Sequence, residues 1–278
     1  MLTKKIFFVL LITAILITAC TSRVDQTPTA IPTSDKIEGL FDIGGMKLYI
    51  SCVGTGSPTI VYLHGSIENE SRSGASSALS IQTMLSDRYR FCVYDRRNVG
   101  KSDEVPGTYT GPEAAADLHA LLAAAGIEPP YVLLGASFGG LLADLYAATY
   151  PDEVIGMVLL DSMIPTIVEL APLVPEDMHL KHEDDCCNNE RLSHLSTVEA
   201  AYELPQPSIP VTYLMAMPFG WYLDVPEYDA VIRDTIEEYV AGFSPGVLIE
   251  LESPHYMEAA VPDVIVRELE KIIEKISP

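Results

Sequence analysis

The sequence predicts an α/β protein with a doubly wound, mostly parallel sheet. Short apolar runs alternate with longer stretches of helical periodicity from about Ile37 onward, which is the pattern of strands joined by covering helices. Runs such as residues 131–134 and 157–160 are apolar on both faces, as expected of parallel strands with helices on each side. A length of 278 residues allows one large domain of this kind.

The individual elements follow from periodicity. We expect strands at residues 47–52, 59–63, 90–94, 131–134, 154–160, 211–215 and 247–251. We expect helices at residues 77–85, 112–125, 139–150, 228–241 and 261–276. Because a doubly wound sheet binds ligands at the carboxyl ends of its strands, the residues directly after each strand are the candidates for a functional site.

The N-terminus predicts export. Two lysines precede the uncharged apolar run at residues 6–19, which is too short to span a bilayer and fits a signal peptide, residues 1–19. The tripeptide at residues 17–19 followed by Cys20 resembles the lipobox of bacterial lipoproteins. That resemblance implies cleavage before Cys20 and acylation of its thiol, so that lipid holds the protein on the extracytoplasmic face of the cell membrane. The alternative is a signal anchor that is not removed.

A tether and a single folded domain are expected after Cys20. Residues 20–37 are rich in Thr, Pro and Ser, a composition that cannot bury enough apolar surface to fold. The domain then covers residues 38–278. With 39 acidic against 17 basic residues, the formal charge is −22, which repels phosphate backbones and anionic substrates. We therefore expect no nucleic-acid partner, and neutral or cationic substrates.

A G-x-S-x-G sequence, formed by Gly135, Ser137 and Gly139, lies between a predicted strand and a predicted helix. In that setting the small residues permit a sharp turn that exposes the serine hydroxyl at the start of the helix, a nucleophile elbow. Ser137 is therefore the candidate nucleophile. The alternative is a glycine-rich turn in which the serine has no role.

Two further strand ends supply groups that such a nucleophile needs. Ser66 follows the strand at residues 59–63, and its N–H together with that of Phe138 is expected to form an oxyanion hole. His255 follows the last predicted strand, where a general base for Ser137 is needed.

Residues 64–65, 94–103 and 135–139, and His255 with Pro262, occur in an order that resembles the α/β-hydrolase superfamily. The resemblance extends over the whole predicted domain. It implies an eight-stranded, mostly parallel sheet with helices on both faces, a serine, an acid and a histidine at strand ends, and hydrolysis through an acyl-enzyme without a cofactor.

The acid is the open member of this set. Asp161 directly follows the strand at residues 154–160, a position that some members of the superfamily use. Asp224, and after it Glu227 or Asp229, follow the next strand and are the alternatives. The acid would fix the tautomer of His255 and stabilise the imidazolium.

Residues 162–207 interrupt the sheet pattern where the superfamily inserts a cap over the site, and such a lid excludes water. Residues 179–187 within it contain His, Asp, Glu and Cys, but their spacing matches no zinc site, and no metal is expected.

In an exported protein, cysteines are expected to form disulfides. The superfamily's strand order makes the strands of Cys52 and Cys92 neighbours and thereby permits a disulfide between them. Cys186 and Cys187 then form a vicinal bridge or stay free.

Together these features predict a lipid-anchored serine hydrolase of the cell envelope that cleaves a small carboxylic ester. Two alternatives remain. One is an amide or peptide hydrolase similar to prolyl aminopeptidases, and the other is a non-catalytic binding protein on the same scaffold.

Overall fold

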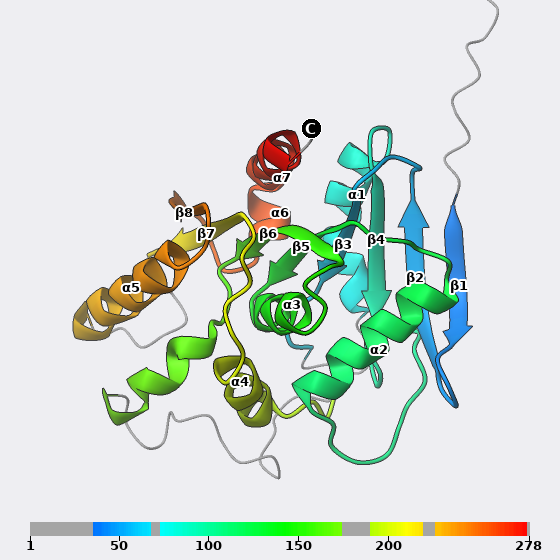
Figure 1. Cartoon of the computed structure of the whole chain (residues 1–278), viewed down its shortest axis with the longest axis horizontal. Helices are drawn as coiled ribbons and strands as arrows, with labels where there is room; N and C mark the ends of the chain where they lie inside the picture. Colours follow the sequence, from blue (N-terminus) through cyan, green and yellow to red (C-terminus); the bar gives the residue numbers. More distant parts are fainter. Residues whose placement is uncertain (1–35, 68–72, 174–189, 219–225, 277–278) are drawn as a thin grey trace, which may run out of the picture. The chain divides into compact units, whose positions relative to one another are not determined.

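A computed structural model describes residues 36–67, 73–173, 190–218 and 226–276. In this part of the chain, an eight-stranded sheet runs in the order β1-β2-β4-β3-β5-β6-β7-β8 (Figure 1). β1, β2 and β4 pair antiparallel, and every other neighbouring pair is parallel. The prediction of a mostly parallel α/β-hydrolase sheet is confirmed. The strands are β1 (Ile37–Asp42), β2 (Lys47–Val53), β3 (Thr59–Leu63), β4 (Arg90–Asp95), β5 (Tyr131–Ala136), β6 (Val154–Leu160), β7 (Val211–Met217) and β8 (Gly246–Glu252).

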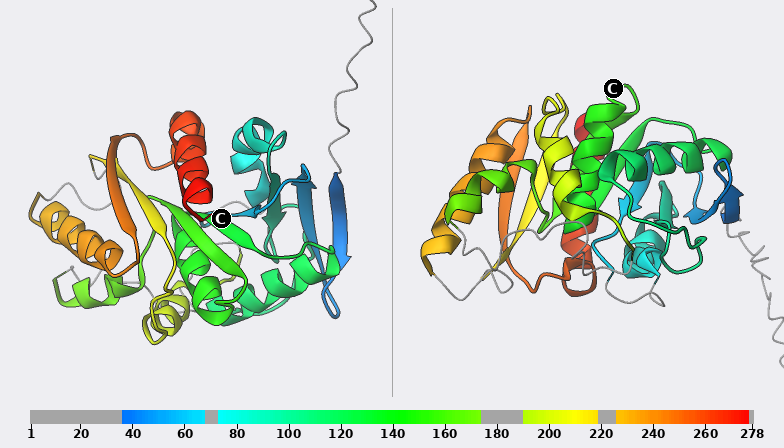
Figure 2. Two further views of the ribbon diagram at one scale, coloured as in Figure 1. Left: turned by 45° about the horizontal axis from the view of Figure 1, so that its top comes forward. Right: turned by 90° about the horizontal axis from the view of Figure 1, so that it is seen from below.

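Helices cover both faces of this sheet (Figure 2). One core contains buried residues of α2, α3, α4 and α5, and a second core on the other face contains buried residues of α1, α6 and α7. None of the described helices is long and apolar enough to cross a membrane. The helices are η1 (Gly74–Ala78), α1 (Leu79–Leu85), α2 (Gly111–Ala124), α3 (Phe138–Thr149), η2 (Pro165–Leu173), α4 (His194–Tyr202), α5 (Pro226–Ala241), α6 (Met257–Ala260) and α7 (Pro262–Ile276).

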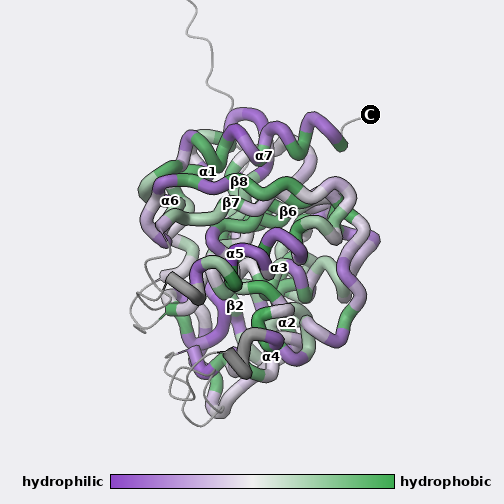
Figure 3. Tube along the Cα trace, turned by 90° about the vertical axis from the view of Figure 1, so that its left-hand side faces the viewer, coloured by the Kyte–Doolittle hydropathy of each residue, from purple (hydrophilic) through white to green (hydrophobic). Residues whose placement is uncertain are grey.

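Local sequence explains where two of these helices begin and which face they bury. Thr110 caps α2 by a reciprocal pair of contacts with Glu113, a capping box. Along α7, Ile265, Leu269 and Ile272 are buried while Arg267, Lys271 and Glu274 are exposed. Hydrophilic and hydrophobic stretches accordingly alternate along the tube of this helix (Figure 3). This period of three to four residues is the helical pattern read from the sequence.

The parallel register brings three strand ends together at one edge of the sheet. Leu63 of β3 lies opposite Gly135 of β5, and Ala136 of β5 lies opposite Leu160 of β6. All residues of β3 and β5 are buried, whereas Ser66 and Ser137 beyond their ends are partly exposed. The segments after β3, β5 and β6 therefore form one site.

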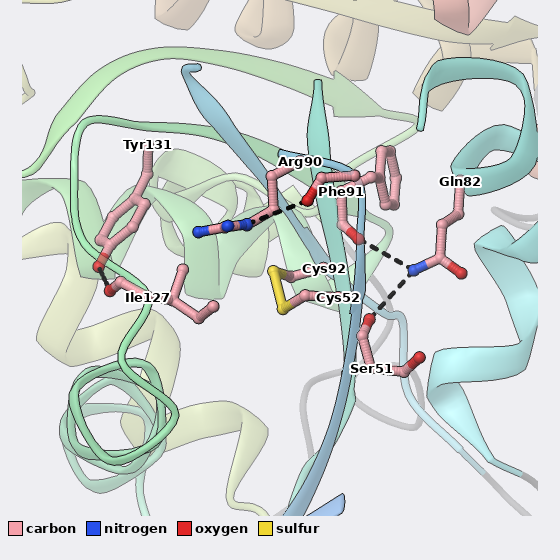
Figure 4. Close-up of a disulfide and its surroundings, with 9 residues drawn as sticks. Ser51, Cys52, Gln82, Arg90, Phe91, Cys92, Ile127 and Tyr131 are labelled. Carbon is pink, nitrogen blue, oxygen red and sulfur yellow. Dashed lines mark hydrogen bonds between the residues drawn. A yellow bond between two sulfur atoms is a disulfide. The ribbon is translucent and has the colours of Figure 1, made fainter. Parts of the chain in front are cut away.

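A disulfide joins the antiparallel strands β2 and β4 (Figure 4). In the sheet these two strands lie on the opposite side of β3 from β5 and β6. Cys52 of β2 lies opposite Cys92 of β4, with 4.0 Å between their Cα atoms. Gln82 of α1 donates from Nε2 to the carbonyls of Ser51 and Phe91 beside it. Cys20, Cys186 and Cys187 lie outside the described residues.

Several elements differ from the sequence-based expectation, the short helices η1 and α6 among them. β1 was missed, and it begins at Ile37, which was assigned to the tether; this residue pairs with Cys52 of β2. The signal was weak because the residue types do not follow the alternating exposure of this strand: Gly39 lies on its partly buried face, and Leu40 on the other face is 49% exposed. The segment expected as a cap contains η2 and α4, which were also not predicted as helices.

Candidate active site

Ser137 lies on a tight turn between β5 and α3. Its backbone has φ 52° and ψ −123°, a conformation that L-residues rarely adopt. Glycines make the turn possible, because a Cβ on Gly139 would lie 2.1 Å from the carbonyl oxygen of Leu63 and one on Gly135 would lie 2.5 Å from the Cα of Gly140. The turn is a nucleophile elbow in its geometry.

His255 connects Ser137 to Asp161. Nε2 of His255 lies 3.0 Å from Oγ of Ser137, and Nδ1 lies 2.6 Å from Oδ2 of Asp161. The Asp161 side chain is 2% exposed and that of His255 is 23% exposed. A serine, a histidine and a buried carboxylate thus form one hydrogen-bonded chain, with its hydroxyl end toward the surface.

β7 holds Asp161 in place. The residue follows β6 with φ 40°, its N–H donates to the carbonyl of Leu214 at 2.7 Å, and its Oδ1 accepts from the N–H of Ala216 at 3.1 Å. One carboxylate oxygen is therefore held by backbone and the other faces His255. Of the alternative acids, Asp224 lies outside the described residues, and Glu227 and Asp229 lie on α5.

The two expected oxyanion donors come from the ends of β3 and β5. Ser66 lies three residues after β3, and Phe138 is the first residue of α3. Between them, Gly65 approaches so closely that an added Cβ would lie 3.2 Å from the Cβ of Ser137. Within the described part of the chain, neither the Ser66 nor the Phe138 amide donates a hydrogen bond to another backbone group.

A buried ion pair supports the backbone around Ser66. Arg96 donates to the carbonyls of His64 at 2.6 Å and Gly65 at 2.8 Å, and forms a bidentate pair with Glu190. Glu190 Oε1 in turn accepts from the N–H of Ile67 at 2.7 Å. Burial alone would lower the pKa of Arg96, but the Glu190 carboxylate outweighs it and holds the pKa above the ordinary value.

His64 belongs to this support and not to the proton-transfer chain. Its ring packs so closely against Gly74 that a Cβ added there would lie 2.1 Å from the ring atom Cδ2. Its Nδ1 lies 2.8 Å from the carbonyl oxygen of Gly65. Burial first, and the Arg96 charge second, lower the pKa of His64 well below its usual value. The imidazole is therefore neutral.

His194 is a contact that the sequence did not reveal. Its Nε2 lies 3.0 Å from Oγ of Ser66, and its ring stacks on Phe138 with 4.0 Å between centroids. The residue begins α4 in the expected cap, far from the strand ends along the chain. Glu190 was missed for the same reason, whereas Arg96 lies in the segment 94–103 that carries the resemblance to the α/β-hydrolase superfamily, which indicates no role for this side chain.

Comparison with known proteins supports the fold. A family model described as the alpha/beta hydrolase fold matches residues 58–181, which contain the elbow, the Ser66 loop and Asp161. The chain has the α/β-hydrolase fold. Among solved structures, this fold is shared with an enol-lactonase from Burkholderia xenovorans LB400, at a TM-score of 0.60 and 17% identity over 85% of this chain and 100% of that one. A thermophilic esterase from Thermogutta terrifontis has a TM-score of 0.59 at 18% identity, covering 88% of this chain and 100% of its own.

Curated relatives of this chain match shorter stretches. The uncharacterised protein YqjL of Bacillus subtilis is 33% identical over 98 residues, which is 35% of this chain and 38% of YqjL. Proline iminopeptidase PfmaB of Pestalotiopsis fici is 32% identical over 120 residues, 42% of this chain and 41% of PfmaB. The matches thus span less than half the length of these two relatives.

Proposed function

We propose that the chain is a serine hydrolase that cleaves a small carboxylic ester through an acyl-enzyme. The observation that carries this proposal is the hydrogen-bonded chain from Ser137 through His255 to Asp161. A nucleophile within hydrogen-bond reach of a base, itself oriented by a carboxylate, is the arrangement that activates a serine hydroxyl. This geometry also favours an enzyme over a non-catalytic binding protein.

In the first half-reaction, Ser137 Oγ attacks the acyl carbon while His255 Nε2 takes the hydroxyl proton. The resulting imidazolium is stabilised by the Asp161 carboxylate at 2.6 Å. Negative charge then develops on the former carbonyl oxygen, and the N–H groups of Ser66 and Phe138 are proposed to stabilise it. Collapse of the intermediate breaks the ester bond, and His255 gives its proton to the leaving alcohol.

In the second half-reaction, water repeats the attack on the acyl-enzyme. His255 takes a proton from the water, the new oxyanion is held by the same amides, and the proton returns to Ser137 as the acid leaves. No redox change takes place, and the steps balance without a cofactor or metal.

The names of similar proteins support ester hydrolysis, and one of them also supports a related reaction, the hydrolysis of amides or peptides. An esterase and an enol-lactonase share the fold, and both names describe cleavage of an ester bond. A proline iminopeptidase matches part of the chain, and the same machinery cleaves amides. Amide or peptide hydrolysis is therefore the second candidate. The acidic net charge of −22 favours neutral or cationic substrates.

The proposal extends to where the enzyme works. The apolar run at residues 6–19 and the lipobox-like sequence before Cys20 support export and anchoring by lipid on the extracytoplasmic face. Mass spectrometry of the membrane fraction tests this: an acylated N-terminal Cys20 is expected, and a chain that retains Met1 in the soluble fraction contradicts it.

Kinetics on the full chain test the reaction. We expect hydrolysis of short-chain p-nitrophenyl esters, lost in Ser137→Ala by at least about 10⁴-fold, and slower cleavage of aminoacyl p-nitroanilides. Faster cleavage of the anilides would favour the peptidase candidate. Turnover of neither substrate by folded protein would contradict the proposed function.

A further inference from the structure

His194 takes no part in the proton transfers proposed above, yet it contacts Ser66 and Phe138 in the candidate site. As the first residue of α4 it approaches the site from the expected cap, whereas Ser66 follows β3 and Phe138 begins α3. Its Nε2 lies 3.0 Å from Ser66 Oγ, and its ring stacks on Phe138 at 4.0 Å with 26° between the planes. One side chain therefore contacts both residues whose amides are the candidate oxyanion donors.

We propose that His194 is a positioning residue that fixes the Ser66 amide relative to the Phe138 amide. The inference rests on the proposed function, because it names the side chain that holds one part of that machinery. Oxyanion stabilisation depends on donors that already point to where charge develops. A displacement of about 1 Å in such a site can cost 100-fold in rate.

The Ser66 loop requires an anchor because the sheet does not reach it. β3 ends at Leu63, so ladder hydrogen bonds stop before Ser66. Arg96 and Glu190 hold the backbone on both sides of this serine, at residues 64, 65 and 67. These contacts fix the neighbours of Ser66 but not Ser66 itself. The side chain of Ser66 is hydrogen-bonded to His194 through its Oγ.

The N-terminus of α4 is itself fixed by contacts with other parts of the domain. Ser193 caps the helix: its Oγ accepts from the N–H of Ser196, and its own N–H donates to the carbonyl of Tyr109 at 2.8 Å. Thr197 packs against the start of α2, where a Cβ on Gly111 would lie 2.4 Å from its Cγ2. The imidazole thus extends from a helix terminus that is tied to the body of the domain.

The imidazole of His194 is suited to holding and not to proton transfer. Burial first, and the charge of Arg96 second, lower its pKa to about 4. At neutral pH the ring is therefore uncharged, and Nε2 either donates to Ser66 Oγ or accepts from it, depending on the tautomer. In both cases the bond and the stack on Phe138 persist.

Three variants separate the two contacts, and a fourth is their control. His194→Phe keeps an aromatic ring against Phe138 and removes the nitrogen, whereas His194→Gln keeps a hydrogen-bonding group and removes the ring. Ser66→Ala removes only Oγ and leaves the N–H. The matched control is His119→Phe, because His119 also stacks on an aromatic ring, that of Tyr150 at 4.2 Å, away from the site.

Kinetics with p-nitrophenyl acetate on the full chain give the readout. We expect kcat to fall about 10- to 100-fold in His194→Phe and in Ser66→Ala, with KM within about twofold, because the loss concerns the transition state. The double variant should be no slower than the worse single variant, since both remove one bond. His194→Gln should recover part of kcat, and His119→Phe should match wild type.

An inhibitor that forms an oxyanion on Ser137, a trifluoromethyl ketone, should bind more weakly to His194→Phe by a factor similar to the loss in kcat. Wild-type kcat in His194→Phe, or fully multiplicative losses in the double variant, would overturn the positioning role. Failure of the proposed function looks different, because wild-type protein would then not react with a fluorophosphonate at Ser137. Ser66→Ala is the smaller change and decides the matter if His194→Phe does not fold.

Discussion

Two serine–histidine pairs lie in the same site at the same spacing. Nε2 of His255 is 3.0 Å from Ser137 Oγ, and Nε2 of His194 is 3.0 Å from Ser66 Oγ. They differ in backbone and in placement. Ser137 is exposed by a strained turn between a strand and a helix, whereas Ser66 lies on a loop held by a buried ion pair.

The charge beside each histidine differs as well. The Asp161 carboxylate lies 2.6 Å from His255 Nδ1, and it would stabilise an imidazolium. Near His194 the charged neighbour is the Arg96 guanidinium, which, added to burial, lowers the pKa of that imidazole to about 4. The comparison teaches that distance alone does not define a nucleophile and its base. The base must be able to become a cation, and in the first pair a carboxylate is hydrogen-bonded to the imidazole.

The largest expected effect comes from removing the charge behind His255. Asp161→Asn should lower kcat for ester hydrolysis by about 10⁴-fold, because the amide neither stabilises the imidazolium nor enforces the productive tautomer. Asp229→Asn is the matched control and should retain wild-type kcat. Normal turnover in Asp161→Asn together with a collapse in Asp224→Asn would show that the acid had been assigned to the wrong strand.

The buried pair that supports the second serine is expected to matter for folding. Glu190→Gln leaves the Arg96 guanidinium buried without its counter-charge, and the free energy of unfolding should fall by about 3–5 kcal/mol. Chemical denaturation measures it. Glu250→Gln is the control, since the Arg233–Glu250 pair is 44% and 39% exposed and should contribute less than about 1 kcal/mol. Equal losses in the two variants would contradict the role given to burial.

Asp144 is another buried carboxyl group, and its pKa is expected to affect stability. Asp144 is 4% exposed within α3, and burial raises its pKa to about 7. Because the folded pKa lies above the unfolded one, the stability from this group is fully present below about pH 4 and is lost as pH rises through 7, roughly 4 kcal/mol in all. Asp144→Asn should remove that part of the slope of unfolding free energy against pH. An unchanged slope would contradict the buried, protonated state.

Most of the sheet could be predicted because two-sided apolar runs are a strong signal. β5 and β6 were correctly predicted as strands. The elbow was predictable because only glycine fits the close backbone approaches at this turn. β1 was missed because an edge strand with one partner has no continuous apolar run. α4 was missed because its sequence has only a weak apolar stripe.

The candidate site was predictable where chemistry follows a strand end. Ser137, His255 and Asp161 each follow a strand, and the register of β5, β6 and their neighbours brings them together. His194 and Glu190 come from a segment whose path depends on tertiary packing. No periodicity or spacing connects Glu190 to Arg96, 94 residues earlier in the chain, so only the folded structure reveals that contact.

The most direct measurement identifies the serine that reacts. The full chain is treated with a fluorophosphonate, digested and mapped by tandem mass spectrometry. The adduct is expected on Ser137, at a rate that falls sharply in Asp161→Asn, with Ser66 unmodified. An adduct on Ser66, or none on folded wild-type protein, would contradict the assignment of Ser137 as the nucleophile.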